Sequence, residues 1–243
     1  MSVPVQPSFV VPPVPDRPRP VTALMGDSLR RPGGRQALSL LSIVLFMAGI
    51  AMFAYPLATD LYSRYQQDRL GSAFDDPKLI ERYRTRTVAE GEVLTRLLIP
   101  KLDVDVLVVE GTSPAALRAG AGHYPKTPLP GEAGNVAIAG HRTTFGRPFN
   151  HLDQLGPGDE VILITPFKKF HYKAVQPFAG HANPWVVTPV DFGVVANTPG
   201  QSTLTLTTCH PKGSAKERLV LRLQLQPELT EDVKSRDLKG AKP

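Results

Sequence analysis

Cysteine is almost absent from this chain of 243 residues, in which Cys209 is the only one. A single cysteine cannot close an internal disulfide, so Cys209 could form an intermolecular bridge, lie buried and inert, or react. It ends the alternating, β-branched stretch from Ser202 to Thr208, which predicts a strand that runs out into a loop. Arg218 follows nine residues later, and a neighbouring cation can activate a thiol whose pKa is ordinarily ~8.5. We therefore interpret Cys209 as a reactive nucleophile rather than as a buried thiol.

Several motifs that would indicate other chemistry are also missing. The chain contains no CxxC or HExxH pair, and a zinc site needs three or four suitable ligands. It has neither a GxSxG serine nucleophile nor a glycine-rich phosphate-binding loop. The formal net charge of +6 does not indicate a nucleic-acid partner, because five of the arginines belong to an N-terminal leader. These absences leave thiol chemistry as the best-supported function.

Charged residues are absent from residues 37–58, which read ALSLLSIVLFMAGIAMFAYPLA. As a helix this run would be about 33 Å long, enough for a hydrocarbon core of about 30 Å. The residues before it are rich in arginine, whereas charges balance after it, so we predict a cytoplasmic N-terminus and an extracellular remainder. A cleaved signal peptide would end at its cleavage site, but the small-x-small triplet Gly49-Ile50-Ala51 lies inside the run. A buried helix of a soluble core is the other alternative, and we favour an uncleaved membrane anchor over both.

Composition divides the rest of the chain. Residues 1–36 are rich in proline and arginine and are predicted to be a disordered cytoplasmic leader. The polar residues 59–92 are predicted to form a partly helical extracellular stalk, and residues 93–226 have the size of one catalytic domain. The charged tail, residues 227–243, is predicted to be mobile.

The region 93–226 has the pattern of an all-β domain. Turn-forming residues separate its short apolar runs, which favours a β-barrel or a sandwich. One short helix is predicted, with Ser113 as its N-cap and Pro114 at its first position. The apolar runs are Leu97–Ile99, Val104–Val109, Val136–Ala139, Val161–Ile164, Phe170–Phe178, Leu204–Leu206 and Leu219–Leu225.

One of the six histidines stands out by its setting. His141 follows an apolar strand that ends at Gly140, where the missing side chain allows a substrate or another strand to approach closely. Reactive side chains at the ends of two strands of one barrel can meet at a common rim, so His141 is the candidate partner of Cys209. His210 directly follows Cys209 and should point to the opposite face of the strand, and His171 lies within a predicted strand. The remaining histidines, His123, His151 and His181, lie in turn-like contexts.

The domain resembles the sortases, membrane-anchored cysteine transpeptidases of mainly Gram-positive bacteria. The motif TLxTC is matched by Thr205-Leu206-Thr207-Thr208-Cys209 and is followed by Arg218, and the family histidine corresponds to His141. The segment 123–159 is similar to a sortase along its whole length, and the resemblance covers roughly residues 93–226. Two motifs are most similar to class E of actinobacteria, with class D as the close alternative. They are Thr-Cys-His-Pro at 208–211 and Gly-His-Arg-Thr-Thr at 140–144.

This resemblance implies a closed eight-stranded β-barrel with short helices, preceded by one transmembrane helix. It implies that Cys209 attacks a C-terminal sorting signal, Leu-Ala-x-Thr-Gly or Leu-Pro-x-Thr-Gly, between threonine and glycine and forms a thioester. His141 would act as acid and then base, Arg218 would hold the oxyanion, and a cell-wall peptidoglycan amine would accept the protein. No cofactor and no metal are implied. The alternatives are a pilin-polymerising or hydrolytic cysteine peptidase, or an exported β-domain that binds ligands without activity.

Overall fold

The computed structural model describes residues 32–234 except residues 75 and 177–179. Residues 1–31 of the predicted disordered leader therefore lie outside the described residues. The chain divides into two compact units, one ending at Phe53 and one beginning at Ala54, and each is described by itself.

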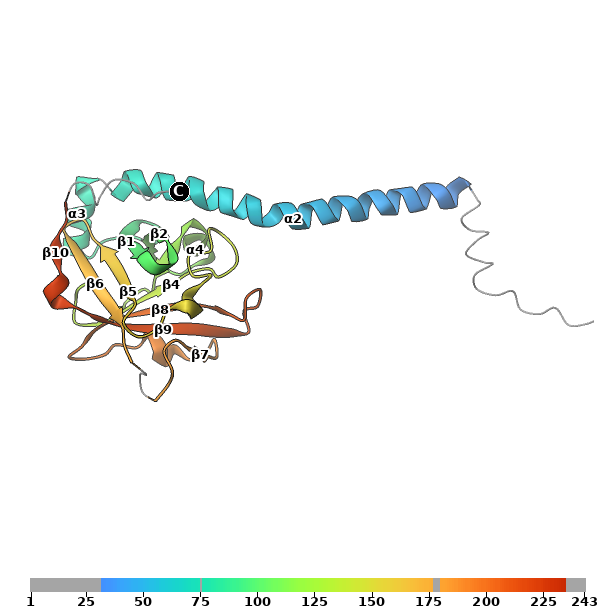
Figure 1. Cartoon of the computed structure of the whole chain (residues 1–243). Helices are drawn as coiled ribbons and strands as arrows, with labels where there is room; N and C mark the ends of the chain where they lie inside the picture. Colours follow the sequence, from blue (N-terminus) through green and yellow to red (C-terminus); the bar gives the residue numbers. More distant parts are fainter. Residues whose placement is uncertain (1–31, 75, 177–179, 235–243) are drawn as a thin grey trace, which may run out of the picture. The chain divides into compact units, whose positions relative to one another are not determined.

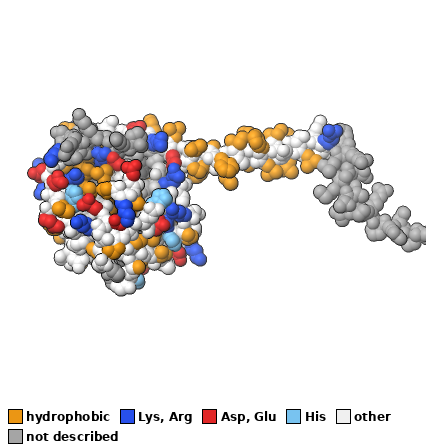
Figure 2. Space-filling view, viewed as in Figure 1, with side chains coloured by type: hydrophobic (Ala, Val, Ile, Leu, Met, Phe, Trp, Pro, Cys, Tyr) orange, Lys and Arg blue, Asp and Glu red, His pale blue; other side chains and the backbone are white. Residues whose placement is uncertain are grey.

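Helix α2 (Pro32–Phe74) begins in the first unit. Its N-terminal part has exposed apolar side chains such as Leu40, Val44 and Phe53. Figure 2 shows that hydrophobic side chains cover much of this helix. Within the described residues α2 is the one helix long and apolar enough to cross a membrane. The helix contains the predicted anchor, but it begins earlier and continues well into the predicted stalk.

The second unit is a closed β-barrel of eight strands (Figure 1). The strands follow one another around the barrel in the order β6-β5-β1-β2-β3-β4-β8-β9, and pairing of β6 with β9 closes it. This closure confirms the predicted fold and leaves none of the eight strands with an open edge along its whole length. Their bounds are β1 (Val93–Ile99), β2 (Val104–Glu110), β3 (Ala121–His123), β4 (Gly134–Ala139), β5 (Glu160–Ile164), β6 (Lys168–Ala174), β8 (Ser202–His210) and β9 (Glu217–Leu225).

Side chains alternate between the interior of the barrel and its outer surface along each strand. Leu204 and Leu206 of β8 and Leu221 and Leu223 of β9 all point into one buried apolar core. Thr205 and Cys209 occupy the alternate positions of β8 and lie on the outer face. The thiol is thus presented on the outside of the barrel, where a peptide could reach it.

The seven predicted apolar runs all overlap strands of the structure. The run Phe170–Phe178 overlaps β6, which ends at Ala174, and its end lies outside the described residues. Three strands were not predicted, namely β3, β7 (Trp185–Val187) and β10 (Glu231–Asp232). They contain only two or three residues each, too few for an alternating pattern to emerge.

The short elements complete the second unit. Helix α4 (Pro114–Ala119) confirms the predicted helix, and the Ser113 side chain accepts a hydrogen bond from the Ala116 N–H at 3.3 Å. The tail predicted to be mobile begins with η4 and with β10, which pairs with β6, whereas residues 235–243 lie outside the described residues. The 3-10 turns are η1 (Pro100–Leu102), η2 (Leu152–Gln154), η3 (Phe192–Val195) and η4 (Pro227–Leu229).

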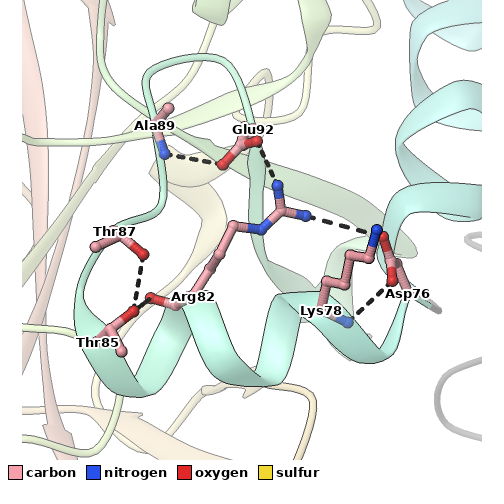
Figure 3. Close-up of polar contacts among 7 residues, drawn as sticks. All are labelled: Asp76, Lys78, Arg82, Thr85, Thr87, Ala89 and Glu92. Atoms are coloured by element: carbon pink, nitrogen blue, oxygen red, sulfur yellow. Dashed lines mark hydrogen bonds and ion pairs between the residues drawn. The ribbon is translucent and has the colours of Figure 1, made fainter.

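Helix α3 (Pro77–Thr85) joins α2 to the barrel (Figure 3). Asp76 caps it by accepting a hydrogen bond from the Lys78 N–H at 2.9 Å. Arg82 donates to Glu92, just before β1, at 2.7 Å. A small apolar cluster of Phe74, Leu79, Val93 and Leu107 lies beneath, so the end of α2 and helix α3 pack against the barrel. The second half of the predicted stalk therefore packs against the barrel through this cluster, and Gln67 in its first half also bonds to β2.

Candidate active site

Cys209, His141 and Arg218 meet at one end of three neighbouring strands. In the antiparallel β8–β9 ladder Cys209 lies directly opposite Arg218. Side chains directly opposite in such a ladder share a face and have Cβ atoms about 5 Å apart. In the parallel β4–β8 ladder Ala139 pairs with Thr207, and His141 and Cys209 each follow two residues later. The order of the strands therefore brings together three residues that are up to 77 positions apart in the chain.

Gly140 fastens the end of β4 to β8 just before His141. Its N–H donates to the Thr207 carbonyl at 3.1 Å, and its own carbonyl accepts from the Thr208 hydroxyl at 2.7 Å. A Cβ at this position would lie 2.6 Å from the ring of Phe149, which is fully buried. Glycine is thus needed here for close approach, but the group that approaches is the ring of Phe149 rather than the substrate or strand expected from the sequence.

His141 is half-buried, and its ring lies against that of Phe145, with centroids 5.1 Å apart. Burial lowers the pKa of His141 below its usual value, and the positive charge of Arg118 on α4 lowers it further. Both effects disfavour the imidazolium form. The neutral imidazole, which can accept a proton, is therefore favoured near neutral pH.

Arg218 faces the same end of the barrel, but its guanidinium turns toward its own hairpin. Nη1 donates to the carbonyls of Ala215 and Glu217, both at 3.0 Å. On the other side of β9, Val187 of β7 pairs with Arg218, so the arginine lies between Cys209 and β7. The side chain is only half-buried, and a substrate carbonyl beside Cys209 could replace either of these acceptors.

Arg142 is a site residue whose importance the sequence did not reveal. It is 4% exposed, and its Nη1 donates to the Cys209 carbonyl at 3.3 Å and contacts His210 Nδ1 at 2.8 Å. Its Nη2 also forms an ion pair with Asp153 at 3.0 Å. This arginine directly follows His141 in the chain and holds the backbone of Cys209, so it links the two candidate catalytic residues. Because these partners are 11, 67 and 68 positions away, sequence spacing gave no signal for them.

A buried polar network lies on the outer face of the same strands. Asn135 of β4 is fully buried and donates to the carbonyls of Val194 and Ala196 at 3.2 and 3.0 Å. Arg222 of β9 also donates to the Val194 carbonyl, at 2.9 Å, and burial lowers its pKa to about 10. These bonds hold the connection that contains η3 over β4, β8 and β9. That connection covers the outer face of the strands near Asn135 and Arg222.

The other histidines that lie in strands have structural partners. His123 Nδ1 contacts Glu110 at 2.7 Å, and His171 Nδ1 contacts Glu160 at 2.9 Å. His210 contacts Arg142, as described above, and points away from the face that carries Cys209. His141 differs from these three histidines in its position, because it follows the end of β4, the strand that adjoins β8.

Known proteins share this domain. The family model described as "Sortase domain" matches residues 97–226, which is more than half of the chain. Sortase SrtE1 of Streptomyces coelicolor is 31% identical over 206 residues, covering 79% of this chain and 58% of that protein. Sortase D of Bacillus subtilis is 30% identical over 134 residues, covering 54% of this chain and 63% of that protein.

Solved structures agree with this match. The sortase D5 transpeptidase of Clostridium perfringens superposes with a TM-score of 0.57 at 25% identity, covering 68% of this chain and 98% of that one. Sortase E1 of Streptomyces coelicolor, solved with a tripeptide in its active site, gives a TM-score of 0.51 at 34% identity, covering 58% and 91%. Relatives of both classes indicated by the sequence motifs, E and D, are thus found.

The chain spans 58% and 63% of the length of the two curated relatives. The matched region nevertheless contains all eight barrel strands except the first residues of β1, together with Cys209, His141 and Arg218. The chain belongs to the sortase family.

Proposed function

We propose that this protein is a membrane-anchored cysteine transpeptidase that joins secreted proteins to an amine of the cell wall. The observation that carries the proposal is the register of β4, β8 and β9, which places Cys209 opposite Arg218 and beside the end of the strand that leads to His141. A nucleophile, an acid–base group and a cation that can hold an oxyanion are the parts that acyl transfer requires.

In the first half of the reaction neutral His141 takes the proton of the Cys209 thiol, and the resulting thiolate attacks the threonine carbonyl carbon of a sorting signal near the C-terminus of a secreted protein. The carbonyl oxygen becomes an oxyanion, to which Arg218 donates hydrogen bonds in place of the Ala215 and Glu217 carbonyls. When the threonine–glycine bond breaks, His141 gives a proton to the departing amine, and a thioester remains on Cys209.

In the second half an amine of a peptidoglycan precursor attacks the thioester. His141, now neutral, takes a proton from this amine, and the new amide forms as the Cys209 thiolate departs. The lowered pKa of His141 suits this base role. The sorting signal expected for a class E enzyme is Leu-Ala-x-Thr-Gly, and Leu-Pro-x-Thr-Gly is the commoner family signal.

The location follows from the same chemistry. Sorting-signal proteins and cell-wall amines lie outside the membrane, so the domain after α2 is proposed to be extracellular and the N-terminus cytoplasmic. The charge asymmetry around residues 37–58 supports this orientation.

Product analysis tests the proposal. The full-length protein in detergent would be incubated with each of the two peptides and a glycine-based amine acceptor, and the products identified by mass spectrometry. We expect the acceptor to be joined to threonine, with the Leu-Ala-x-Thr-Gly peptide preferred, and no product from Cys209→Ala. Cleavage without transfer in the presence of excess acceptor would instead indicate a hydrolytic peptidase.

A further inference from the structure

The C-terminal half of α2 contacts the loop that follows His141. Asp60, in this half, accepts a hydrogen bond from the Gly146 N–H through Oδ1 at 3.1 Å. Its Oδ2 forms an ion pair with the Arg147 guanidinium at 2.8 Å. The Asp60 side chain is 20% exposed, whereas that of Arg147 is 47% exposed. Ion pairs with such an exposed partner contribute little by themselves, so the backbone bond to a largely buried carboxylate is the firmer link.

The contacted loop has a backbone that needs support. Phe145, Gly146 and Arg147 have φ angles of 51°, 74° and 48°, three consecutive residues in the left-handed region. Non-glycine residues seldom adopt this conformation, and consecutive ones persist only where surrounding contacts fix them. At Gly146 the loop and helix approach so closely that a Cβ would lie 2.8 Å from the hydroxyl of Ser63. Asp60 and Ser63 therefore clamp this turn from the helix side.

The clamped turn carries the ring that contacts the catalytic candidate. Phe145 lies between Tyr62 of α2, with ring centroids 6.3 Å apart in an edge-on arrangement, and His141, with centroids 5.1 Å apart. Thus a continuous path of contacts leads from the helix through Phe145 to the imidazole.

The helix itself is held firmly to the barrel two turns further along. Gln67 donates to the Ala119 carbonyl at 2.7 Å and accepts from the Leu107 N–H at 2.7 Å. A cavity of about 410 Å³ lies between these contacts and the Asp60 contacts, lined by Arg64, Asp103 and Val104 among others. The Asp60 clamp is thus a separate point of attachment beside the loop, rather than a part of the continuous packing around Phe74.

We propose that Asp60 is a positioning residue for His141: the C-terminal half of α2 holds the turn of residues 145–147 so that Phe145 keeps the imidazole in place beside Cys209. The role in catalysis rests on the proposed function. Because α2 also contains the candidate membrane span, the proposal makes the helix that would anchor the protein a working part of its active site.

The test compares variants of the full-length protein in detergent. Asp60→Ala removes both acceptors, and we expect kcat for peptide transfer to fall about tenfold with KM little changed, since small displacements of a catalytic group act on kcat. Asp60→Asn keeps an oxygen for the Gly146 N–H and should lose less. Asp68→Ala, which removes an exposed carboxylate two turns along the same helix, is the matched control and should retain full activity.

Two further measurements separate positioning from a general loss of structure. Asp60→Ala, Arg147→Ala and their combination form a cycle in which the double variant should be no slower than the slower single variant. The imidazole resonances of His141, identified with His141→Gln, should shift in Asp60→Ala because the Phe145 ring moves, whereas the melting temperature should change little. Unchanged resonances in Asp60→Ala, or full activity of an active wild type after this substitution, would overturn the proposal. A wild type without transfer activity would instead contradict the proposed function, and the resonance test would still decide the role of Asp60.

Discussion

Arg218 lies across the ladder from Cys209, and the shape of its side chain matters as well as its charge. The guanidinium has five donors in a fixed plane, so it can turn from the backbone carbonyls of its hairpin to a developing oxyanion and hold it with more than one hydrogen bond. A lysine at this position would keep the positive charge but not the geometry.

We therefore expect Arg218→Lys to reduce kcat at least about 100-fold, the effect typical of losing an oxyanion donor. Steady-state kinetics of peptide transfer would measure it. Arg84→Lys, at an exposed position of α3, is the control and should behave like wild type. Near wild-type turnover in Arg218→Lys would contradict the role assigned to this arginine.

His141 offers a second test at the scale of one residue. Its pKa is lowered first by burial and second by the charge of Arg118, and each raises the free energy of the imidazolium. In Arg118→Gln the second effect disappears, so the pKa of His141 should rise, yet it should stay below the ordinary value because burial remains. At a pH between the two values, a larger fraction of the variant's imidazole is then protonated.

A titration of the histidine resonances by NMR, assigned with His141→Gln, would measure this rise. Arg118→Lys keeps the positive charge and should leave the pKa of His141 where it is in the wild type. If Arg118→Gln and the wild type titrate identically, the charge of Arg118 does not act on His141.

At the scale of elements, the end of β4 must lie close to β8 for the site to form. Gly140 makes two hydrogen bonds to β8 and leaves room for the buried ring of Phe149. In Gly140→Ala the added methyl group would displace either the Phe149 ring or the end of β4. This displacement should lower the free energy of unfolding by about 1–3 kcal/mol.

Thermal unfolding of Gly140→Ala should accordingly show a melting temperature lower by several degrees, and activity should fall because His141 is the next residue. Gly156→Ala is the matched control, since a Cβ there would meet no atom within 4 Å. Equal stability and activity of the two variants would show that the close approach at Gly140 is not required.

The sequence predicted the long strands well because their apolar residues alternate or run continuously, as in Leu219–Leu225. It also placed Cys209 and His141 at strand ends. The parallel pairing of β4 with β8 could not be predicted from periodicity, because it joins segments about 68 residues apart through tertiary packing. The residues that hold the site, Arg142 and Asp60, were missed for the same reason, since their bonds cross between distant segments.

At the scale of the whole molecule, α2 combines an apolar N-terminal part with a C-terminal part that packs on the barrel. The face that packs is marked by Thr59, Ser63, Gln67, Leu70 and Phe74, spaced three or four residues apart as on one side of a helix. Three of these five residues are polar, so the apolar residues of this segment do not by themselves show the helical spacing.

The lone cysteine makes the membrane orientation directly measurable. If the barrel lies outside the cell, a membrane-impermeant maleimide should label intact cells at the half-buried Cys209. Labelling should be absent from Cys209→Ala, and a permeant maleimide should label no more of the wild type than the impermeant one. Labelling by the impermeant reagent only after lysis would place the domain on the cytoplasmic side.

In the proposed reaction Cys209 carries the acyl group during transfer. The most direct measurement is the intact mass of the full-length protein after brief incubation with a Leu-Ala-x-Thr-Gly peptide without acceptor, followed by acid quenching. We expect a mass increase equal to the peptide up to its threonine, located on Cys209, removed by hydroxylamine and absent from Cys209→Ala. Cleavage of the same peptide by the Cys209→Ala variant at the wild-type rate would contradict it.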